Sequence, residues 1–259
     1  MRTARGLEDL ERSSEPAFIV VGVFDGLHLG HAYLLEHLVA EAARRDARPM
    51  VITFDHHPDE VLTGTAPPLL CDPEERLDLL EAAGVGTTVV VHFDQRLRET
   101  TYDAFTAQIA DRVPVAGFLM TPDAAFGYER RGTPEALAAL GEARGFEVVV
   151  VPPFALDGHP VRSSEVRRAI AAGDIGLATR LLGRPHAVVG DAVEGWQGSV
   201  VSFPLPVALP PDGPWDVDVF AAGATSRTVA HLADGELAVG GIEPGTRLRV
   251  AFLGGHLAT

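Results

Sequence analysis

The stretch VVGVFDGLHLGHAYLLEHL, Val20 to Leu38, decides the fold of this chain. It continues an apolar, partly β-branched run, Phe18 to Val21, that has the length and composition of a buried strand. Gly22 and Gly26 then permit a tight turn. From about His31 the leucines recur at the spacing of one helical face. The stretch therefore predicts a strand, a glycine turn and a helix, in that order.

The junction between turn and helix is a candidate anion site. The first N–H groups of a helix lack partners, and the helix dipole favours negative charge there. Gly30 would let a phosphate approach the backbone, and His28 and His31 point the same way if the first turn is already helical. Two imidazoles aimed at one phosphate could stabilise the charge that develops in nucleotidyl transfer. The alternative is that both histidines only cap a helix and fill a loop.

Gly22 to His31, written G-x-F-D-G-x-H-x-G-H, resembles the signature of the FMN adenylyltransferase module of bacterial FAD synthetases. These bifunctional riboflavin kinase/FMN adenylyltransferases belong to the wider H-x-G-H nucleotidyltransferases. The resemblance implies an α/β fold with a Rossmann-like parallel sheet. It also implies that His28 and His31 hold a triphosphate and stabilise the transition state, and that Asp25 fixes the turn rather than acting as a base. The remaining nucleotide-binding positions of the turn are Gly22, Phe24, Gly26 and Gly30.

Composition excludes several classes of protein. The chain has 259 residues, enough for one large domain or two modest ones, and 46% of them are apolar. A formal net charge of −15 argues against general nucleic-acid binding. No apolar run is long enough to span a membrane. The polar N-terminus and the single cysteine, Cys71, predict a cytoplasmic protein without an intramolecular disulfide.

A second candidate part of the site follows the apolar strand Pro49–Phe54. Its continuation, Asp55 to Pro58, resembles the family pattern F-x-P-H-P, which Phe54, His57 and Pro58 match while His56 replaces a proline. Polar residues after a parallel strand lie where α/β sheets bind ligands. Phe54 and His57 are therefore expected on the rim of the site. The alternative is a surface loop with incidental histidines.

The loop from Thr121 to Gly132 resembles the family segment G-x-[DN]-F-x-F-G-x-x-R-x-G, which contributes to the flavin and nucleotide pocket. Thr121 replaces a glycine and Ala124 replaces the first phenylalanine, which could loosen the grip on the isoalloxazine or alter substrate choice. Phe126 either contacts the flavin ring or plugs the core below the loop. Arg96 and Arg98, upstream, are expected to be solvated surface charges, and the alternative is that they touch a ligand. The positions that match the pattern are Asp123, Phe126, Gly127, Arg130 and Gly132.

A third motif, Val161 to Ile170, combines Ser163, Ser164 and Arg167. The serines are N-cap signals of an amphipathic helix, and Arg167 lies one turn after Ser163. Hydroxyls, helix N–H groups and a guanidinium would make a second phosphate cradle. An ordinary capped helix is the alternative. The segment resembles the family's S-S-T-x-I-R motif, which contacts the ATP phosphates, and Leu177–Pro185 resembles the L-A-x-x-L-L-G-R-P that closes the module.

After residue 186 the sequence changes to short β-like runs separated by Gly, Pro and Asp turns, which predict a small antiparallel barrel or sandwich. Val193–Gly195 and Phe203–Pro204 resemble the opening of the riboflavin kinase barrel. The kinase motif P-T-A-N stands here as Pro204–Val207, and neither Leu205 nor Val207 can coordinate a metal. We therefore expect a reduced barrel without kinase activity.

These observations predict two domains, a nucleotidyltransferase over residues 1–186 and a small all-β domain over residues 187–259. The expected reaction is FMN + ATP → FAD + pyrophosphate, with Mg²⁺ offsetting charge and no metal held by protein ligands. Ser163, Ser164 and Arg167 would hold the β/γ end of ATP. Partners are expected to be small molecules, without nucleic acid or membrane, and a homo-oligomer is possible. The alternatives are an H-x-G-H nucleotidyltransferase for another phosphorylated acceptor and a non-catalytic flavin- or nucleotide-binding protein.

Overall fold

The computed structural model describes residues 1–195 and 198–256, which form two compact units. The first contains Met1–Phe24, Gly30–Pro67 and Leu77–Ala155, and the second contains Asp25–Leu29, Pro68–Arg76 and the chain from Leu156 onward. The second unit thus takes in two short pieces of the N-terminal sequence. The division at residue 186 remains a prediction, and residues 196–197 and 257–259 of its second domain lie outside the described residues.

The first unit is built on a sheet in which every strand pairs in parallel with its neighbours, in the order β1-β4-β3-β2-β5-β6. Apolar β-branched runs form its central strands, because both faces of a parallel sheet are covered. The strands are β1 (Arg2–Arg5), β2 (Ala17–Val21), β3 (Arg48–Phe54), β4 (Thr87–Val91), β5 (Val115–Met120) and β6 (Glu147–Val150). The predicted Rossmann-like α/β fold is confirmed.

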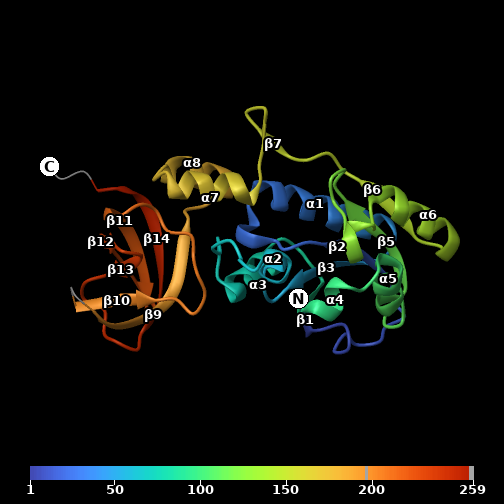
Figure 1. Cartoon of the computed structure of the whole chain (residues 1–259), viewed down its shortest axis with the longest axis horizontal. Helices are drawn as coiled ribbons and strands as arrows, with labels where there is room; N and C mark the ends of the chain where they lie inside the picture. Colours follow the sequence, from blue (N-terminus) through green and yellow to red (C-terminus); the bar gives the residue numbers. More distant parts are fainter. Residues whose placement is uncertain (196–197, 257–259) are drawn as a thin grey trace. The chain divides into compact units, whose positions relative to one another are not determined.

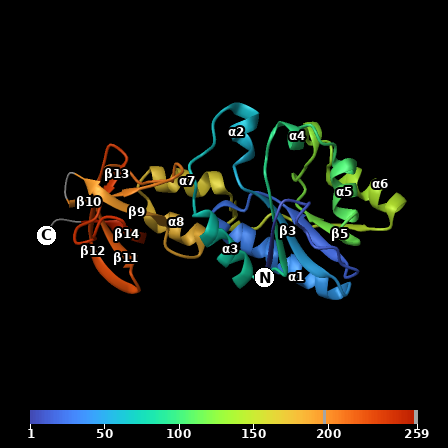
Figure 2. The same cartoon turned by 90° about the horizontal axis from the view of Figure 1, so that it is seen from below.

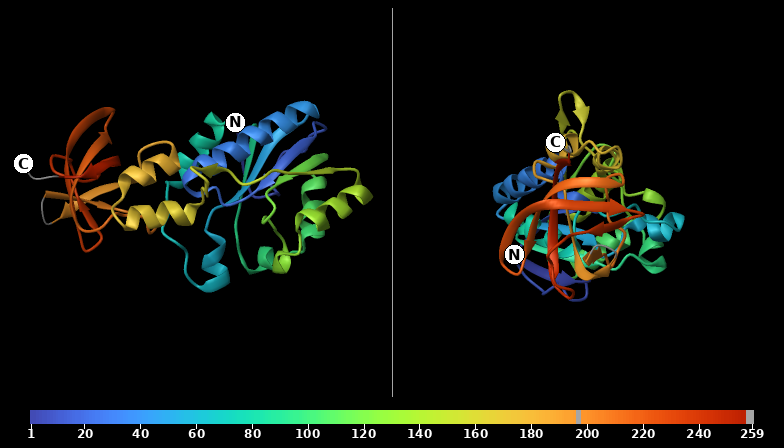
Figure 3. Two further views of the ribbon diagram at one scale, coloured as in Figure 1. Left: turned by 90° about the horizontal axis from the view of Figure 1, so that it is seen from above. Right: turned by 90° about the vertical axis from the view of Figure 1, so that its left-hand side faces the viewer.

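Helices lie on both faces of this sheet: α1 covers one face, and α5 and α6 cover the other (Figures 2 and 3). The sequence marks their ends. Thr133 caps α6, since its hydroxyl accepts from Ala136 N at 3.3 Å, and Gly145, with φ of 80°, ends it. The helices up to this point are α1 (Leu29–Arg44), α2 (Pro58–Thr63), α3 (Pro73–Ala82), α4 (Gln95–Arg98), α5 (Tyr102–Ala110) and α6 (Pro134–Arg144), with 3-10 turns η1 (Asp25–Leu27) and η2 (Tyr128–Arg130).

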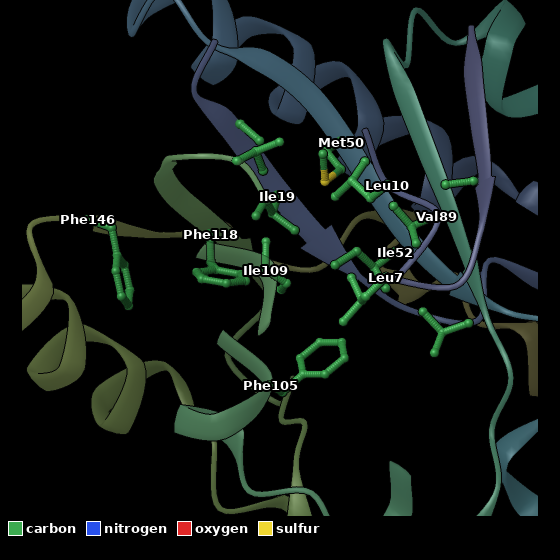
Figure 4. Close-up of a cluster of buried hydrophobic side chains, with 14 of the residues drawn as sticks. Leu7, Leu10, Ile19, Met50, Ile52, Val89, Phe105, Ile109, Phe118 and Phe146 are labelled. Carbon is green, nitrogen blue, oxygen red and sulfur yellow. The ribbon is translucent and has the colours of Figure 1, made fainter. Parts of the chain in front are cut away.

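The core of the first unit lies between the sheet and the α5/α6 layer. Figure 4 shows Phe105 and Ile109 of α5 pointing toward Ile19, Ile52 and Phe118 of the strands. Phe105 and Ile109 are 4% and 0% exposed, as their helical spacing predicts. Strand β1 was not predicted. It has four residues, of which only Ala4 is buried, so its sequence does not show the alternation by which a strand is recognised.

The second unit contains a closed six-stranded barrel with the order β10-β13-β12-β11-β14-β9, in which all pairs are antiparallel (Figure 1). Its strands are β9 (Ala187–Gly195), β10 (Gly198–Ser202), β11 (Gly213–Ala221), β12 (Ala224–Ala233), β13 (Glu236–Ala238) and β14 (Arg247–Gly255). Val217, Val219, Val250 and Phe252, each at most 1% exposed, belong to its core. The predicted β-barrel is confirmed.

A two-stranded sheet of β7 (Ala155–Leu156) and β8 (His159–Pro160), and the helices α7 (Ser163–Ala171) and α8 (Ile175–Leu182), precede the barrel. The expectation that serines cap α7 is wrong: Arg162 stands at the N-cap without a capping side-chain bond, and Ser163 and Ser164 form the first turn. Ser163 instead donates its hydroxyl to the Asp25 carbonyl at 3.2 Å. Within the described ranges, no helix is long and apolar enough to cross a membrane.

Candidate active site

Hydrogen bonds with β3 hold the backbone at the start of the turn that follows β2. Gly22 N donates to Ile52 O at 3.0 Å, and the buried Thr53 hydroxyl donates to Val23 O at 2.9 Å. Phe24 follows in the left-handed region, with φ of 54°, and its side chain is 1% exposed. A non-glycine residue in this conformation is strained and persists only where surrounding contacts impose it. The turn is therefore a fixed structure rather than a loose connection.

Asp25 is the centre of a buried polar cluster in the second unit. Its side chain is 4% exposed and forms an ion pair with Arg167, and it accepts a hydrogen bond from Leu70 N at 2.9 Å. Burial raises the pKa of Asp25, while Arg167 and the Leu70 amide act in the opposite direction. Asp25 thus ties the turn to α7 and to the chain at Leu70.

Contacts of Gly26 with Leu70 and with Cys71 complete this turn. Gly26, with φ of 78°, would place an added Cβ 2.8 Å from the Cβ of Leu70, so no larger residue fits there. Gly26 N donates to the Cys71 sulfur at 3.3 Å. Burial, with a smaller contribution from Asp25, raises the pKa of Cys71 to about 12, so it remains a thiol. Cys71 therefore packs and accepts a hydrogen bond here, and it has no nucleophilic character.

His28 lies next to two arginines. Burial, reinforced by Arg167 and Arg184, lowers the pKa of His28 to about 4, so the imidazole is neutral near pH 7. The guanidinium of Arg184, a partly buried residue, donates to Leu27 O at 3.3 Å. A neutral imidazole beside two cations can donate an N–H to an anion while the arginines neutralise its charge. This group has the chemistry of a phosphate site.

The two histidines of the motif differ in position. Helix α1 begins at Leu29, so His28 precedes it, and the condition for a parallel His28/His31 pair on one helical face is not met. His31 is in the first turn, and its ring lies 5.0 Å from the ring of Phe24. Gly30 also lies in this first turn rather than in the loop.

The first unit contains a cavity of about 650 Å³ at the carboxyl ends of β2, β3 and β4. Its walls are mainly apolar, and its lining includes the exposed side chain of Leu62. Such a cavity suits a flat aromatic ligand better than a charged one. The lining residues are Val21, Gly22, Val23, Phe54, Pro58, Leu62, Phe93, Leu97, Arg98, Thr100, Phe105, Ala124, Ala125, Phe126, Gly127, Tyr128, Glu129 and Arg130.

The 121–132 loop supplies one wall of this cavity. Phe126 packs against the rings of Phe105 and Phe118, both at 5.7 Å, as a core plug below the loop would, and it also lines the cavity. Its contact with a flavin ring stays a prediction. Arg130 lines the cavity and donates to Asp123 O at 3.1 Å, while the Asp123 carboxylate accepts from the Thr121 hydroxyl at 2.8 Å. Asp123 is exposed and is not among the lining residues.

Gly127 and the two residues after Tyr128 explain the shape of the loop. Gly127, with φ of 76°, would place a Cβ 2.5 Å from Tyr102 N, so only glycine fits. Glu129 and Arg130 have φ of 53° and 55°, a strained conformation for both. This strain lies on the wall of the cavity, as is common at ligand sites.

Phe54 lines a second wall of the cavity, whereas His57 is not among the lining residues. Phe54 meets Phe93 edge to face at 5.3 Å, and both rings line the cavity. His57 is the N-cap of α2, where its Nδ1 accepts from Asp59 N at 3.2 Å. Arg98 is exposed, as expected, and also belongs to the lining of the cavity.

Metal-ligand spacing occurs at one place in the part of the chain that the structure describes. Asp55, His56 and His92 bring one ligand atom each within 4.8 Å of the others. Two imidazoles and one carboxylate do not match the oxygen ligands that Mg²⁺ prefers.

Comparison with known proteins decides the family. The family model for FAD synthetase matches residues 10–165 of the chain, and these residues include most of both units' candidate site residues. The chain belongs to the FAD synthetase family.

Curated relatives of this chain include bifunctional riboflavin kinase/FMN adenylyltransferases. The protein from Haemophilus influenzae is 32% identical over 207 residues, covering 79% of this chain and 67% of the relative. That from Escherichia coli K12 is 33% identical over 208 residues, covering 79% and 66%. The chain therefore spans about two thirds of the length of the relatives it matches. A crystal structure described as a macrolide-efflux protein from Streptococcus pneumoniae shares the fold, with a TM-score of 0.83, 24% identity, and coverage of 98% and 90% of the two chains.

The FAD synthetase motifs identified in the sequence account for only part of the site. Leu70 and Cys71 were missed, because the chain around them carries no motif and only the fold brings it to Asp25. Arg184 was quoted within L-L-G-R-P but given no role, although it lies beside His28. The available signal was the arginine of the L-L-G-R-P motif itself.

Proposed function

We propose that this chain is an FMN adenylyltransferase, which transfers AMP from ATP to FMN and releases pyrophosphate. The observation that carries the proposal is the turn Gly22–His31. Gly22 and Val23 line the apolar cavity, and Asp25 and His28 belong to the arginine-rich cluster. Val23 and Asp25 are two positions apart in the sequence, so covalent geometry keeps their Cα atoms within about 7 Å. One continuous turn thus serves a site for an aromatic ring and a site for phosphates.

In this reaction a phosphate oxygen of FMN attacks the α-phosphorus of ATP, and the bond from that phosphorus to the bridging oxygen of the β-phosphate breaks. The leaving pyrophosphate takes the electron pair, and no protein nucleophile is required. His28, neutral near pH 7, would donate an N–H to a phosphate oxygen, and Arg184 would neutralise the developing charge. Arg167 has five N–H donors, and its bonds to Pro68 and Asp25 leave capacity for the β/γ end together with Ser164.

FMN is assigned to the first unit's cavity, where Phe54, Phe93 and Phe126 offer ring surfaces. His31, Gly30 and Asp123 remain predicted site residues by family resemblance. Mg²⁺ would accompany the ATP phosphates and offset part of their charge. A cytoplasmic location, the absence of nucleic-acid binding and the oligomeric state remain predictions.

Kinase activity is not expected. At the position that resembles P-T-A-N, Leu205 and Val207 lack groups that could bind a metal or donate to phosphate. Val207 instead packs against the barrel core, and its neighbours Pro206 and Ala208 form backbone hydrogen bonds with Leu69. This stretch is committed to packing and backbone pairing.

The test is chromatographic separation of flavins after incubation with ATP, Mg²⁺ and either FMN or riboflavin. FAD formed from FMN, with no product from riboflavin, is the expected result. FMN formed from riboflavin would contradict the inference of a kinase-dead barrel. If neither flavin reacts, the acceptor assignment is wrong, and pyrophosphate release with other phosphorylated acceptors would favour a different nucleotidyltransferase.

The variant His28→Ala distinguishes an enzyme from a non-catalytic binding protein. For an enzyme we expect turnover to fall by about 10² to 10³, since one preorganised donor to the transition state is lost. His159→Ala, at an exposed position of β8, is the matched control and should leave turnover unchanged. FMN and ATP binding without turnover in the unmodified protein would favour the binding protein.

A further inference from the structure

The segment Pro68–Arg76, called here the 68–76 segment, holds both partners of the buried ion pair. Leu70 N donates to the two carboxylate oxygens of Asp25 at 2.9 and 3.2 Å. Pro68 O accepts from Arg167 Nε at 2.8 Å. The Leu70 side chain is 1% exposed and lies against Gly26. The position of Asp25 and Arg167 therefore depends on where this segment lies.

The barrel holds the same segment through its backbone. Leu69 N donates to Pro206 O at 2.8 Å, and Ala208 N donates to Leu69 O at 2.8 Å, so Leu69 pairs with the chain between β10 and β11. Ala208 is fixed in turn by the buried His186, whose Nε2 hydrogen-bonds to Ala208 O at 2.7 Å. Because adjacent residues of an extended chain face opposite ways, Leu69 can pair with the barrel while Leu70 serves Asp25.

Two arginines of β14 bind the C-terminal half of the segment. Arg249 donates from Nε and Nη2 to Glu75 Oε1 at 3.1 and 3.0 Å, and the two side chains are only 30% and 17% exposed. Arg247 Nη2 donates to Asp72 Oδ2 at 3.2 Å, while Asp72 Oδ1 caps α3 by accepting from Glu74 N at 2.9 Å. Half-buried charged pairs with this geometry hold position better than solvated ones.

We propose that the barrel positions the anion site: it holds the 68–76 segment, and the segment sets Asp25 and Arg167 for the phosphates. Arg249 and Glu75 are positioning residues, since neither is assigned to the phosphates themselves. This explains what a barrel without the kinase side chains contributes to an adenylyltransferase. The part that concerns phosphate binding rests on the proposed function, whereas the structural part does not.

The experiment compares Arg249→Gln with Arg227→Gln in the full chain. Arg227 is the matched control, because it forms a two-bond ion pair with Asp218, at 2.8 and 2.9 Å, within the barrel and away from the segment. Hydrogen exchange of peptides covering the 68–76 segment is followed by mass spectrometry. We expect about tenfold faster exchange at Leu70 in Arg249→Gln, since a charge-assisted contact is lost, and no change in Arg227→Gln. Unchanged exchange in Arg249→Gln overturns the proposal, whether or not FMN reacts.

The second readout is calorimetric titration with pyrophosphate. Arg249→Gln is expected to weaken pyrophosphate binding about tenfold, and the swap Glu75→Arg with Arg249→Glu is expected to restore most of it. Faster exchange with unchanged pyrophosphate affinity would refute the link to the anion site. Equal losses in Arg249→Gln and Arg227→Gln would show a general loss of barrel stability instead, and would also refute it. If the unmodified protein neither binds pyrophosphate nor converts FMN, the proposed function fails while the exchange result still stands.

An independent observation concerns Asp55, His56 and His92 of the first unit. Phe54 pairs in register with Val91, so the next residues, Asp55 and His92, leave neighbouring parallel strands side by side. The Asp55 carboxylate is oriented by His56 N at 2.7 Å and Phe93 N at 3.3 Å. Its oxygens lie 2.7 Å from His92 Nδ1 and 3.2 Å from His56 Nδ1.

We infer that these three side chains bind a transition-metal ion of the zinc class. Two imidazole nitrogens and one carboxylate oxygen suit Zn²⁺, Co²⁺ or Ni²⁺, and the two backbone donors hold the carboxylate as metal sites require. All three side chains are 32–66% exposed, so an ion reaches them from solvent. Phe54 and Phe93, the adjacent residues, line the cavity, and the ion would sit at its rim.

Titration of the full chain with Co²⁺, followed by its visible absorption spectrum, tests this site. We expect one saturable equivalent, and at least a tenfold loss of affinity in His92→Gln, as removal of one of three ligands implies. His159→Gln should bind Co²⁺ normally. No saturable spectrum, or an equal loss in both variants, overturns the inference.

Discussion

His28 and His186 should make the folded chain sensitive to mild acid. Both imidazoles are at most 4% exposed, and burial lowers the pKa of each to about 4. In the unfolded chain a histidine has a pKa of about 6.5. Between these values the unfolded state binds more protons than the folded state, so stability falls as the pH drops from about 6.5 toward 4.

The size of this loss of stability follows from the linkage between proton binding and unfolding. Each histidine lowers the free energy of unfolding by about 2 kcal/mol between pH 7 and pH 5, so the two together lower it by about 4 kcal/mol. Carboxylates with lowered pKa values, such as Glu41 and Asp55, lose their contribution only at about pH 4 and below, outside this window. Asp25, with a raised pKa, acts in the opposite direction. When the pH-dependent losses of stability of two variants are subtracted, the contributions of the titrating groups that both variants contain cancel.

The assay is urea unfolding at about pH 7 and pH 5, followed by tryptophan fluorescence, to which the buried Trp215 contributes. His186→Gln retains an N–H donor for Ala208 O but cannot take up a proton in this range. We expect its loss of stability between the two pH values to be about 2 kcal/mol smaller than that of the unmodified chain. His159→Gln, exposed, should behave like the unmodified chain. An equal loss in all three proteins would refute the assignment of acid sensitivity to buried histidine.

Three further substitutions, with Gly64→Ala as a control, test the turn and the cavity. Gly26→Ala should lower stability to urea by about 3 kcal/mol, because its φ is 78° and Leu70 lies 2.8 Å from the new Cβ, whereas Gly64→Ala, with φ of 82° and nothing within 4 Å, should lower it by about 1 kcal/mol. Equal losses would contradict the packing argument. Thr53→Val removes the donor to Val23 O and should lower the stability by about 1 to 2 kcal/mol, measured in the same way. Ala124→Phe adds a ring to the cavity wall and should tighten FMN binding about tenfold by fluorescence quenching; weaker binding would show that the ring occupies the flavin's space.

The sequence by itself determined the elements around the glycine turn and their order, although it did not reveal strand β1. Strand, glycine turn and helix could be identified at Val20–Leu38, because apolar periodicity and glycine act over a few residues. The short β-like runs and their Gly, Pro and Asp turns likewise predicted a small antiparallel barrel or sandwich after residue 186, and the structure has the barrel. The family followed from ordered motifs, each of which is a local pattern.

Only the tertiary structure decided which groups meet. Leu70 lies 45 positions from Asp25, and Arg167 lies 142 positions from it, so no local pattern could pair them. The protonation state of His28 could not be predicted from the sequence either, because its neutrality depends on burial and on Arg167 and Arg184. The motif predicted two like histidines, whereas the fold places His28 before α1 and His31 within it. Burial and long-range contact are properties of the folded chain, and they set the charge of each group at the site.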